Sequence, residues 1–105
     1  MTRLAVAIAA VLLGLAAWAV AAPAPQKLAI HEFKFLPPSV TVTPGTTVTW
    51  VNQDEETHMV TSATGAFAST ALEHEGKFSH TFAAPGAYTY FCALHPLMRA
   101  TVTVK

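Results

Sequence analysis

The 105-residue sequence predicts an all-β domain, a β-sandwich or β-barrel of about seven short strands. Apolar residues alternate with polar ones in short runs, which is the period of a half-buried strand. Turn-forming prolines and glycines separate these runs. Beyond residue 22 no helical period is sustained long enough to predict a helix.

The first predicted strands lie on either side of a change in phase. Residues 28–30 alternate on one face, and residues 33–35 alternate in the opposite parity. The change at 31–32 predicts a β-bulge or an edge kink. The pair Pro37-Pro38 ends this stretch, because proline lacks the N–H that a strand ladder needs.

The next strands lead into a polar loop. Residues 40–42 alternate, a turn follows at Pro44-Gly45, and residues 46–52 form the next strand. An acidic loop at 52–57 then leads to an extended piece at 58–62. We expect three aromatic residues of this half of the chain to lie in the core: Phe33, Phe35 and Trp50.

The second half of the chain begins irregularly and ends in three strands. Residues 63–76 predict at most a short helical turn around 69–73. Residues 77–82 alternate again, and the turn at 84–86 leads to a strand over 87–92. The predicted last strand covers residues 99–105.

The N-terminal segment predicts export. Residues 1–21 combine an early arginine, a long apolar run and a small-x-small site, which is typical of a signal peptide cleaved after Ala21. The alternative is a retained membrane anchor, although the apolar run is short for a span. Residues 22–27 then form a leader and residues 28–105 the domain. We expect a periplasmic or otherwise exported protein.

Charge and cysteine content exclude several classes of protein. The formal net charge is zero, so nothing suggests binding to nucleic acid or to an anionic membrane. The single cysteine, Cys92, cannot form an internal disulfide. It is therefore a buried passenger, an intermolecular bridge or a ligand.

The segment Cys92-Ala93-Leu94-His95-Pro96-Leu97-Met98 spaces a thiolate, an imidazole and a thioether three residues apart. His58, at the start of another extended piece, is a second imidazole. Two His, one Cys and a weak Met are the ligand set of a blue-copper electron-transfer site. Zinc competes for Cys and His, but a structural zinc site prefers stronger donors than Met.

This motif, preceded by residues 86–91, resembles that of the small blue-copper proteins, the cupredoxins. The two-residue gaps on both sides of His95 are most similar to those of amicyanins. Residues 44–52 resemble the family's strand that leads to its first His. Two positions depart from the family: Met59 stands where an Asn usually ties the two ligand loops, and Leu94 stands where close relatives often have Pro. The Leu94 N–H is free to point at the Cys92 sulfur, which would raise the reduction potential.

The resemblance implies a Greek-key β-sandwich of seven to eight strands that carries single electrons and is not an enzyme. It implies one copper ion per chain, with His58, Cys92 and His95 as equatorial ligands and Met98 as the axial one. It also implies transient docking of a dehydrogenase, cytochrome or oxidase at Pro96 and Leu97, and a monomeric protein.

Two other functions remain open from the residues alone. A periplasmic copper carrier would use the same ligands, although such carriers more often expose additional Met or His clusters. An enzyme would use Cys92 as nucleophile and His95 as base, but no orienting third residue stands at a recognisable spacing.

The remaining polar residues have ordinary interpretations. His31 is a solvated or hydrogen-bonded imidazole rather than a second metal contact, His80 is half-buried and His74 is exposed. The acidic run at 54–56 is a solvated loop or a steering patch for a basic partner.

Overall fold

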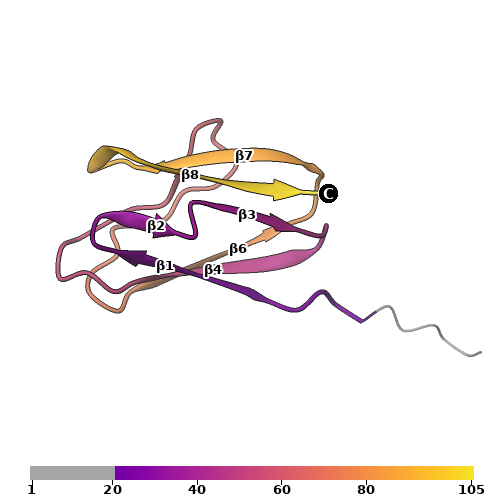
Figure 1. Cartoon of the computed structure of the whole chain (residues 1–105), viewed down its shortest axis with the longest axis horizontal. Coiled ribbons are helices and arrows are strands. Elements are labelled where there is room, and N and C mark those ends of the chain that lie inside the picture. The colour runs from indigo at the N-terminus through magenta and orange to yellow at the C-terminus, as the bar shows by residue number, and fades with distance from the viewer. Residues whose placement is uncertain (1–20) are drawn as a thin grey trace, which may run out of the picture.

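The computed structural model describes residues 21–105, which form eight strands in two four-stranded sheets (Figure 1). The predicted all-β sandwich is thus confirmed. The signal-peptide prediction concerns a segment that lies, apart from Ala21, outside the described residues. Nothing in residues 21–105 forms a helix with the length and apolar character that a membrane span requires. The strands are β1 (Gln26–His31), β2 (Lys34–Leu36), β3 (Ser39–Val42), β4 (Thr46–Asn52), β5 (Thr61–Ser62), β6 (Lys77–Phe82), β7 (Gly86–Cys92) and β8 (His95–Val104).

The two sheets have the orders β2-β1-β4-β6 and β3-β8-β7-β5. Each sheet contains one parallel pair, β1 with β4 and β3 with β8, and the other pairs are antiparallel. The apolar faces of both sheets enclose one core, which runs the length of the sandwich.

Strand β4 shows how the sequence pattern builds this core. Every second residue of β4 is buried, as the alternation predicts. Trp50 is fully buried, and its ring centroid lies 5.3 Å from that of Tyr90 in the opposite sheet and 5.7 Å from that of Phe78. Aromatic contacts of this kind contribute about 0.5–1.5 kcal/mol each beyond the area that they bury.

Two predictions on local structure are wrong. Residues 31–34 form a tight hairpin rather than a bulge: His31 pairs with Lys34, and Glu32 and Phe33 both have positive φ. Positive φ at both central residues is what a two-residue hairpin turn needs to match the right-handed twist of its strands. The expected helical turn around 69–73 is absent from the described chain, because Leu72 forms a β-bridge with His58.

Strand boundaries also differ from the prediction. Strand β1 begins at Gln26, inside the expected leader, because Gln26 pairs with Val48 of β4. Strand β8 begins at His95 rather than at Arg99, so His95 and Met98 lie on a strand and not in a loop.

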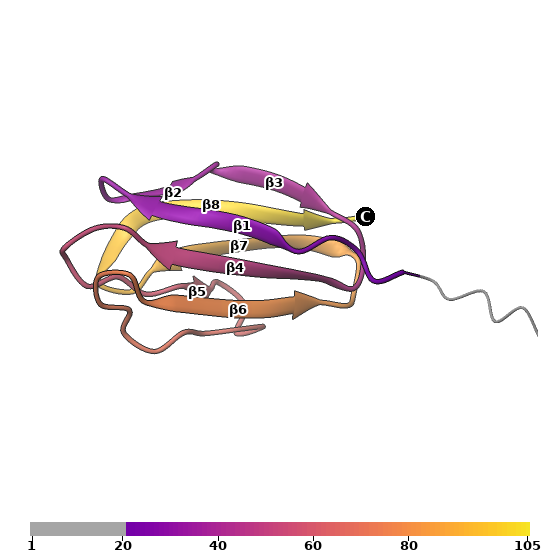
Figure 2. The same cartoon turned by 90° about the horizontal axis from the view of Figure 1, so that it is seen from below.

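The turns β1–β2 and β7–β8 lie at one end of the sandwich, on the left of Figure 1, and the C-terminus lies at the other. The loop that follows β4 reaches the same left end, as Figure 2 also shows. Segments that are far apart in the sequence therefore meet at one pole of the molecule.

Candidate metal centre

Cys92 and His95 are brought together by the tight turn between β7 and β8. Cys92 is the last residue of β7 and pairs with His95, the first residue of β8, after a shift in register at Phe91. The turn thus folds the two side chains toward each other, and the Cys92 sulfur lies 3.6 Å from His95 Nδ1. Cys92 is fully buried and His95 is half-buried.

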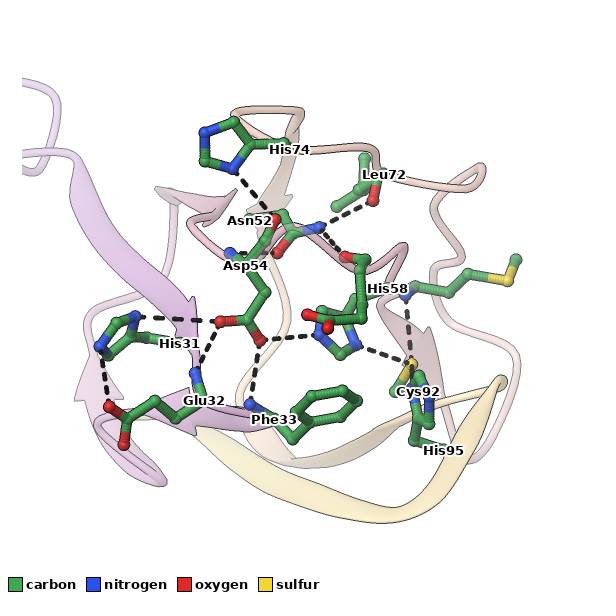
Figure 3. Close-up of polar contacts among 12 residues, drawn as sticks. His31, Glu32, Phe33, Asn52, Asp54, His58, Leu72, His74, Cys92 and His95 are labelled. Atoms are coloured by element: carbon green, nitrogen blue, oxygen red, sulfur yellow. Dashed lines mark hydrogen bonds and ion pairs between the residues drawn. The ribbon is translucent and has the colours of Figure 1, made fainter.

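His58 reaches the same point from the loop after β4. A two-way backbone bridge to Leu72 fixes its main chain, with N–O distances of 3.1 and 2.8 Å. Its ring is fully buried, with Nδ1 3.7 Å from the Cys92 sulfur. The ligand atoms of His58, Cys92 and His95 all lie within 4.8 Å of one another (Figure 3).

These donors form a soft, nitrogen- and sulfur-rich site. No carboxylate belongs to this group of residues in the described chain. Two imidazoles and a thiolate suit copper in both of its oxidation states, whereas a site for magnesium or calcium would be built from oxygens.

The Cys92 sulfur also accepts a hydrogen bond from the backbone N–H of Met59, at 3.3 Å. This contact joins the loop that carries His58 to the strand that carries Cys92. The two segments are therefore linked even though Met59 replaces the Asn that is usual in the family. The donor found at this sulfur in the described structure is the Met59 N–H and not the Leu94 N–H, so the effect of Leu94 on the reduction potential stays a prediction.

Asp54 is the carboxylate nearest to the site and was not recognised from the sequence. Only 9% of it is exposed, so it is neither a solvated residue nor a steering charge. Its Oδ2 lies 2.8 Å from His58 Nε2, and its two oxygens accept the N–H groups of Glu32 and Phe33 at 2.7 and 2.9 Å (Figure 3). A carboxylate four residues before a candidate ligand His is the only signal that the sequence offers for it.

Asn52 organises the loop that contains Asp54. Its side-chain amide donates to the carbonyls of Glu56 and Leu72, both at 2.8 Å, and its carbonyl oxygen accepts the Asp54 N–H at 3.0 Å. A buried amide with all these bonds satisfied holds residues 52–58 in one conformation.

Phe33 was expected in the core, but 42% of it is exposed. Its ring lies edge-on against both imidazoles, with centroid distances of 5.0 Å to His58 and 4.9 Å to His95. Phe35 and Trp50 are buried as predicted. The tight hairpin turn explains the difference, because it turns Phe33 out of the sheet and over the metal centre.

Met98 is buried on β8, three residues after His95, and its neighbours on the strand are exposed. It therefore points into the sandwich at the pole where the other candidate ligands lie. It also lines a cavity of about 170 Å³ together with Phe33 and Leu97.

The other histidines lie outside this cluster. His31 is half exposed, with Nε2 3.6 Å from Glu32 and Nδ1 3.9 Å from Asp54. His74 is partly exposed and contacts the Asp54 carbonyl through Nδ1 at 3.0 Å. His80 is half-buried against Phe67 and Phe82, as predicted, and this burial lowers its pKa.

The fold and the site define a copper-binding β-sandwich, and comparisons with known proteins agree. The family model for copper binding proteins of the plastocyanin/azurin family matches residues 24–105. The chain therefore belongs to this family.

Individual relatives refine the comparison. The amicyanin of Paracoccus versutus is 37% identical in an alignment of 81 residues, and the match covers 72% of this chain and 61% of the relative, so the chain spans less than two thirds of that protein. The crystal structure of Paracoccus versutus amicyanin matches with a TM-score of 0.70 at 34% identity, covering 77% of this chain and 81% of that one.

An enzyme shares the same fold. A copper-containing nitrite reductase from Thermus scotoductus matches with a TM-score of 0.74 at 27% identity, over 79% of this chain but only 23% of that one. The shared part is a single domain within a much longer protein.

Proposed function

We propose that the protein is a type 1 (blue) copper electron carrier that exchanges single electrons with other redox proteins. The observation that carries this proposal is the convergence of His58 Nδ1, the Cys92 sulfur and His95 Nδ1 within 4.8 Å. A bound copper ion supplies the redox chemistry, since it alternates between Cu(I) and Cu(II). The amicyanin relatives and the copper-binding family support the choice of metal.

We propose that His58, Cys92 and His95 would hold one copper ion per chain as its three strong ligands, and that Met98 would be a weak fourth ligand. The side chains fit this role because His58 and His95 each direct a ring nitrogen toward the buried Cys92 sulfur, and Met98 is buried on β8. Blue-copper sites combine His₂Cys with a long axial Met.

The surroundings of these residues keep their positions fixed. Cys92 and His95 are paired across β7 and β8, and His58 is paired with Leu72. Because backbone pairing and the Met59 N–H hold the donors, we expect them to move little when the charge of the site changes. Little rearrangement favours fast electron exchange.

Partners would dock on an apolar surface around His95, which we call the apolar rim. Leu97 is 97% exposed and Leu94 51%, and Pro96 between His95 and Leu97 is exposed as well. Leu36, which is 38% exposed, and Phe33 line the same cavity as Leu97 and so extend this surface to β2. An exposed apolar area of this kind marks an interaction site, and small, weak contacts suit transient electron-transfer encounters.

No catalytic activity is proposed. The nitrite reductase contains much more chain than this domain, and the described residues hold one cluster of metal-ligating side chains. We also propose that the protein is exported, which the features of residues 1–21 support, and that it acts as a monomer.

The purified protein, mixed with Cu(II), tests this function against a copper-carrier role. An electron carrier develops an intense blue colour that ascorbate removes and ferricyanide restores. A carrier of the ion binds Cu(I) without colour and transfers it to a chelator or a second protein. Colourless binding with no reversible reduction would overturn the proposal.

A further inference from the structure

Asp54 lies in a polar loop, but its side chain is buried and hydrogen-bonded rather than solvated. It follows β4 by two residues and is nearly buried beside the metal centre. Its carboxylate receives three donors: His58 Nε2, the Glu32 N–H and the Phe33 N–H. Burial of a carboxylate is costly unless such donors compensate it, so these three hydrogen bonds are what allow Asp54 to lie there.

Both oxygens of the Asp54 carboxylate already serve as acceptors. Oδ1 accepts the Glu32 N–H at 2.7 Å and Oδ2 accepts the Phe33 N–H at 2.9 Å. A carboxylate that binds in this way accepts hydrogen bonds and has no proton to donate to the imidazole.

The partner nitrogen of His58 must therefore donate. At 2.8 Å from Asp54 Oδ2, Nε2 carries the proton, and in a neutral imidazole Nδ1 is then free of one. Nδ1 is the nitrogen that faces the Cys92 sulfur at 3.7 Å. Asp54 thus selects the neutral tautomer whose free lone pair is on Nδ1, the nitrogen on the side of Cys92.

The same carboxylate also holds the β1–β2 turn. Glu32 and Phe33 have φ of 51° and 58°, a region that residues other than Gly seldom occupy. Both of their N–H groups point at Asp54, which compensates this strained turn. The turn carries the Phe33 ring to its place against His58 and His95.

We propose that Asp54 is a positioning residue for the metal centre: one carboxylate presets the His58 tautomer and fixes the turn that places Phe33 over both imidazoles. This inference rests on the proposed copper function for its consequence, but not for its geometry. The tautomer is set in the metal-free protein, before any ion binds.

The test compares Asp54→Asn with the wild type. An amide has one acceptor oxygen and an NH₂ group that can only donate, so it cannot accept all three N–H groups. Either one backbone N–H loses its partner or His58 shifts its proton to Nδ1. The matched control is Glu56→Gln, which removes the same charge from an exposed residue two positions away.

Two measurements distinguish a positioning role of Asp54 from a purely structural one. Long-range ¹H–¹⁵N spectra of the metal-free wild type should show the His58 proton on Nε2, and Asp54→Asn should populate the Nδ1-protonated form. Affinity for Cu(II) should fall about 10- to 100-fold in Asp54→Asn, the usual loss when the partner of a ligand His is removed. Glu56→Gln should leave both unchanged.

The outcomes are distinct. A proton on Nδ1 in the wild type overturns the proposal, whether or not the variant folds. So does a variant that melts at a lower temperature but keeps the wild-type tautomer and affinity. If the wild type takes up no Cu(II) while the tautomer is as expected, the proposed function fails and the positioning role of Asp54 stands.

Phe33→Leu tests the second half of the proposal. This variant should keep the tautomer, since it retains the backbone N–H, but it should shift the visible spectrum of the copper-loaded protein. An unchanged spectrum removes the part of the proposal that concerns Phe33.

Discussion

The two histidines of the metal centre occupy different environments. His58 is fully buried, and its two ring nitrogens face Asp54 and Cys92. His95 is half-buried among the exposed residues of the apolar rim, and the ring contacts found for it in the described structure are with Cys92, His58 and Phe33. The comparison teaches that one side of the site is enclosed and held by hydrogen bonds, whereas the other side opens toward solvent, where we propose that partners dock.

The largest expected effect separates these two histidines directly. His58→Gly and His95→Gly should both lose the blue colour, because each removes a strong ligand. Added imidazole should restore colour in His95→Gly, where the vacancy opens toward solvent, but not in His58→Gly, where it is enclosed. Absorption spectra during an imidazole titration measure this. Equal restoration of the blue colour in both variants would contradict the difference in solvent access between the two histidines.

Met98→Ala tests the proposed fourth ligand, and its effect should be smaller. The three strong donors remain, so the protein should still take up copper. Loss of the weak axial donor should shift the visible bands and change the reduction potential, because the axial ligand tunes blue-copper sites. Visible spectra and voltammetry check this, and an unaltered potential would exclude Met98 as a ligand.

Leu97→Asp tests the partner-facing side without touching a ligand. Leu97 is almost fully exposed, so the free energy of unfolding should change by no more than about 0.5 kcal/mol. Electron self-exchange should slow about tenfold, since two rims then meet with like charges. The control is Ala83→Asp, an exposed residue at the opposite pole. NMR line broadening in mixed Cu(I) and Cu(II) samples measures the rate; equal slowing in both variants argues against docking at the rim.

The smallest effect is expected from substitution of His80, which lies far from the candidate metal centre. Burial lowers its pKa in the folded protein, so protonation favours the unfolded chain. Its contribution to stability is therefore complete above the ordinary pKa of about 6.5 and is lost as the pH falls through the lowered value. The difference in unfolding free energy between wild type and His80→Gln should change with pH below about 6.5. A difference that stays constant across this range would contradict the assignment.

The local parts of this molecule were predictable from the sequence. Cys92 and His95 are close along the chain, and the structure brings them together as their spacing predicts. The role of Met98 stays a proposal. The alternation of β4 and β6 likewise predicts which side chains are buried, because the two-residue period is local.

The parts that depend on distant segments were not predictable. The parallel pairing of β1 with β4 determines that β1 starts at Gln26, and no local pattern encodes a parallel partner. The roles of Asp54 and Phe33 depend on a turn with two positive φ values, in a segment that contains no Gly. Without Gly as a marker, the phase change at 31–32 resembles a bulge, and Phe33 resembles a core residue.

The central claim is most directly tested by the visible spectrum of the purified protein on addition of one equivalent of Cu(II). An intense thiolate-to-copper band near the red end of the spectrum, bleached by ascorbate and regenerated by ferricyanide, is the predicted result. A pale Cu(II) complex without such a band, or a blue one that persists in Cys92→Ser, would contradict the account.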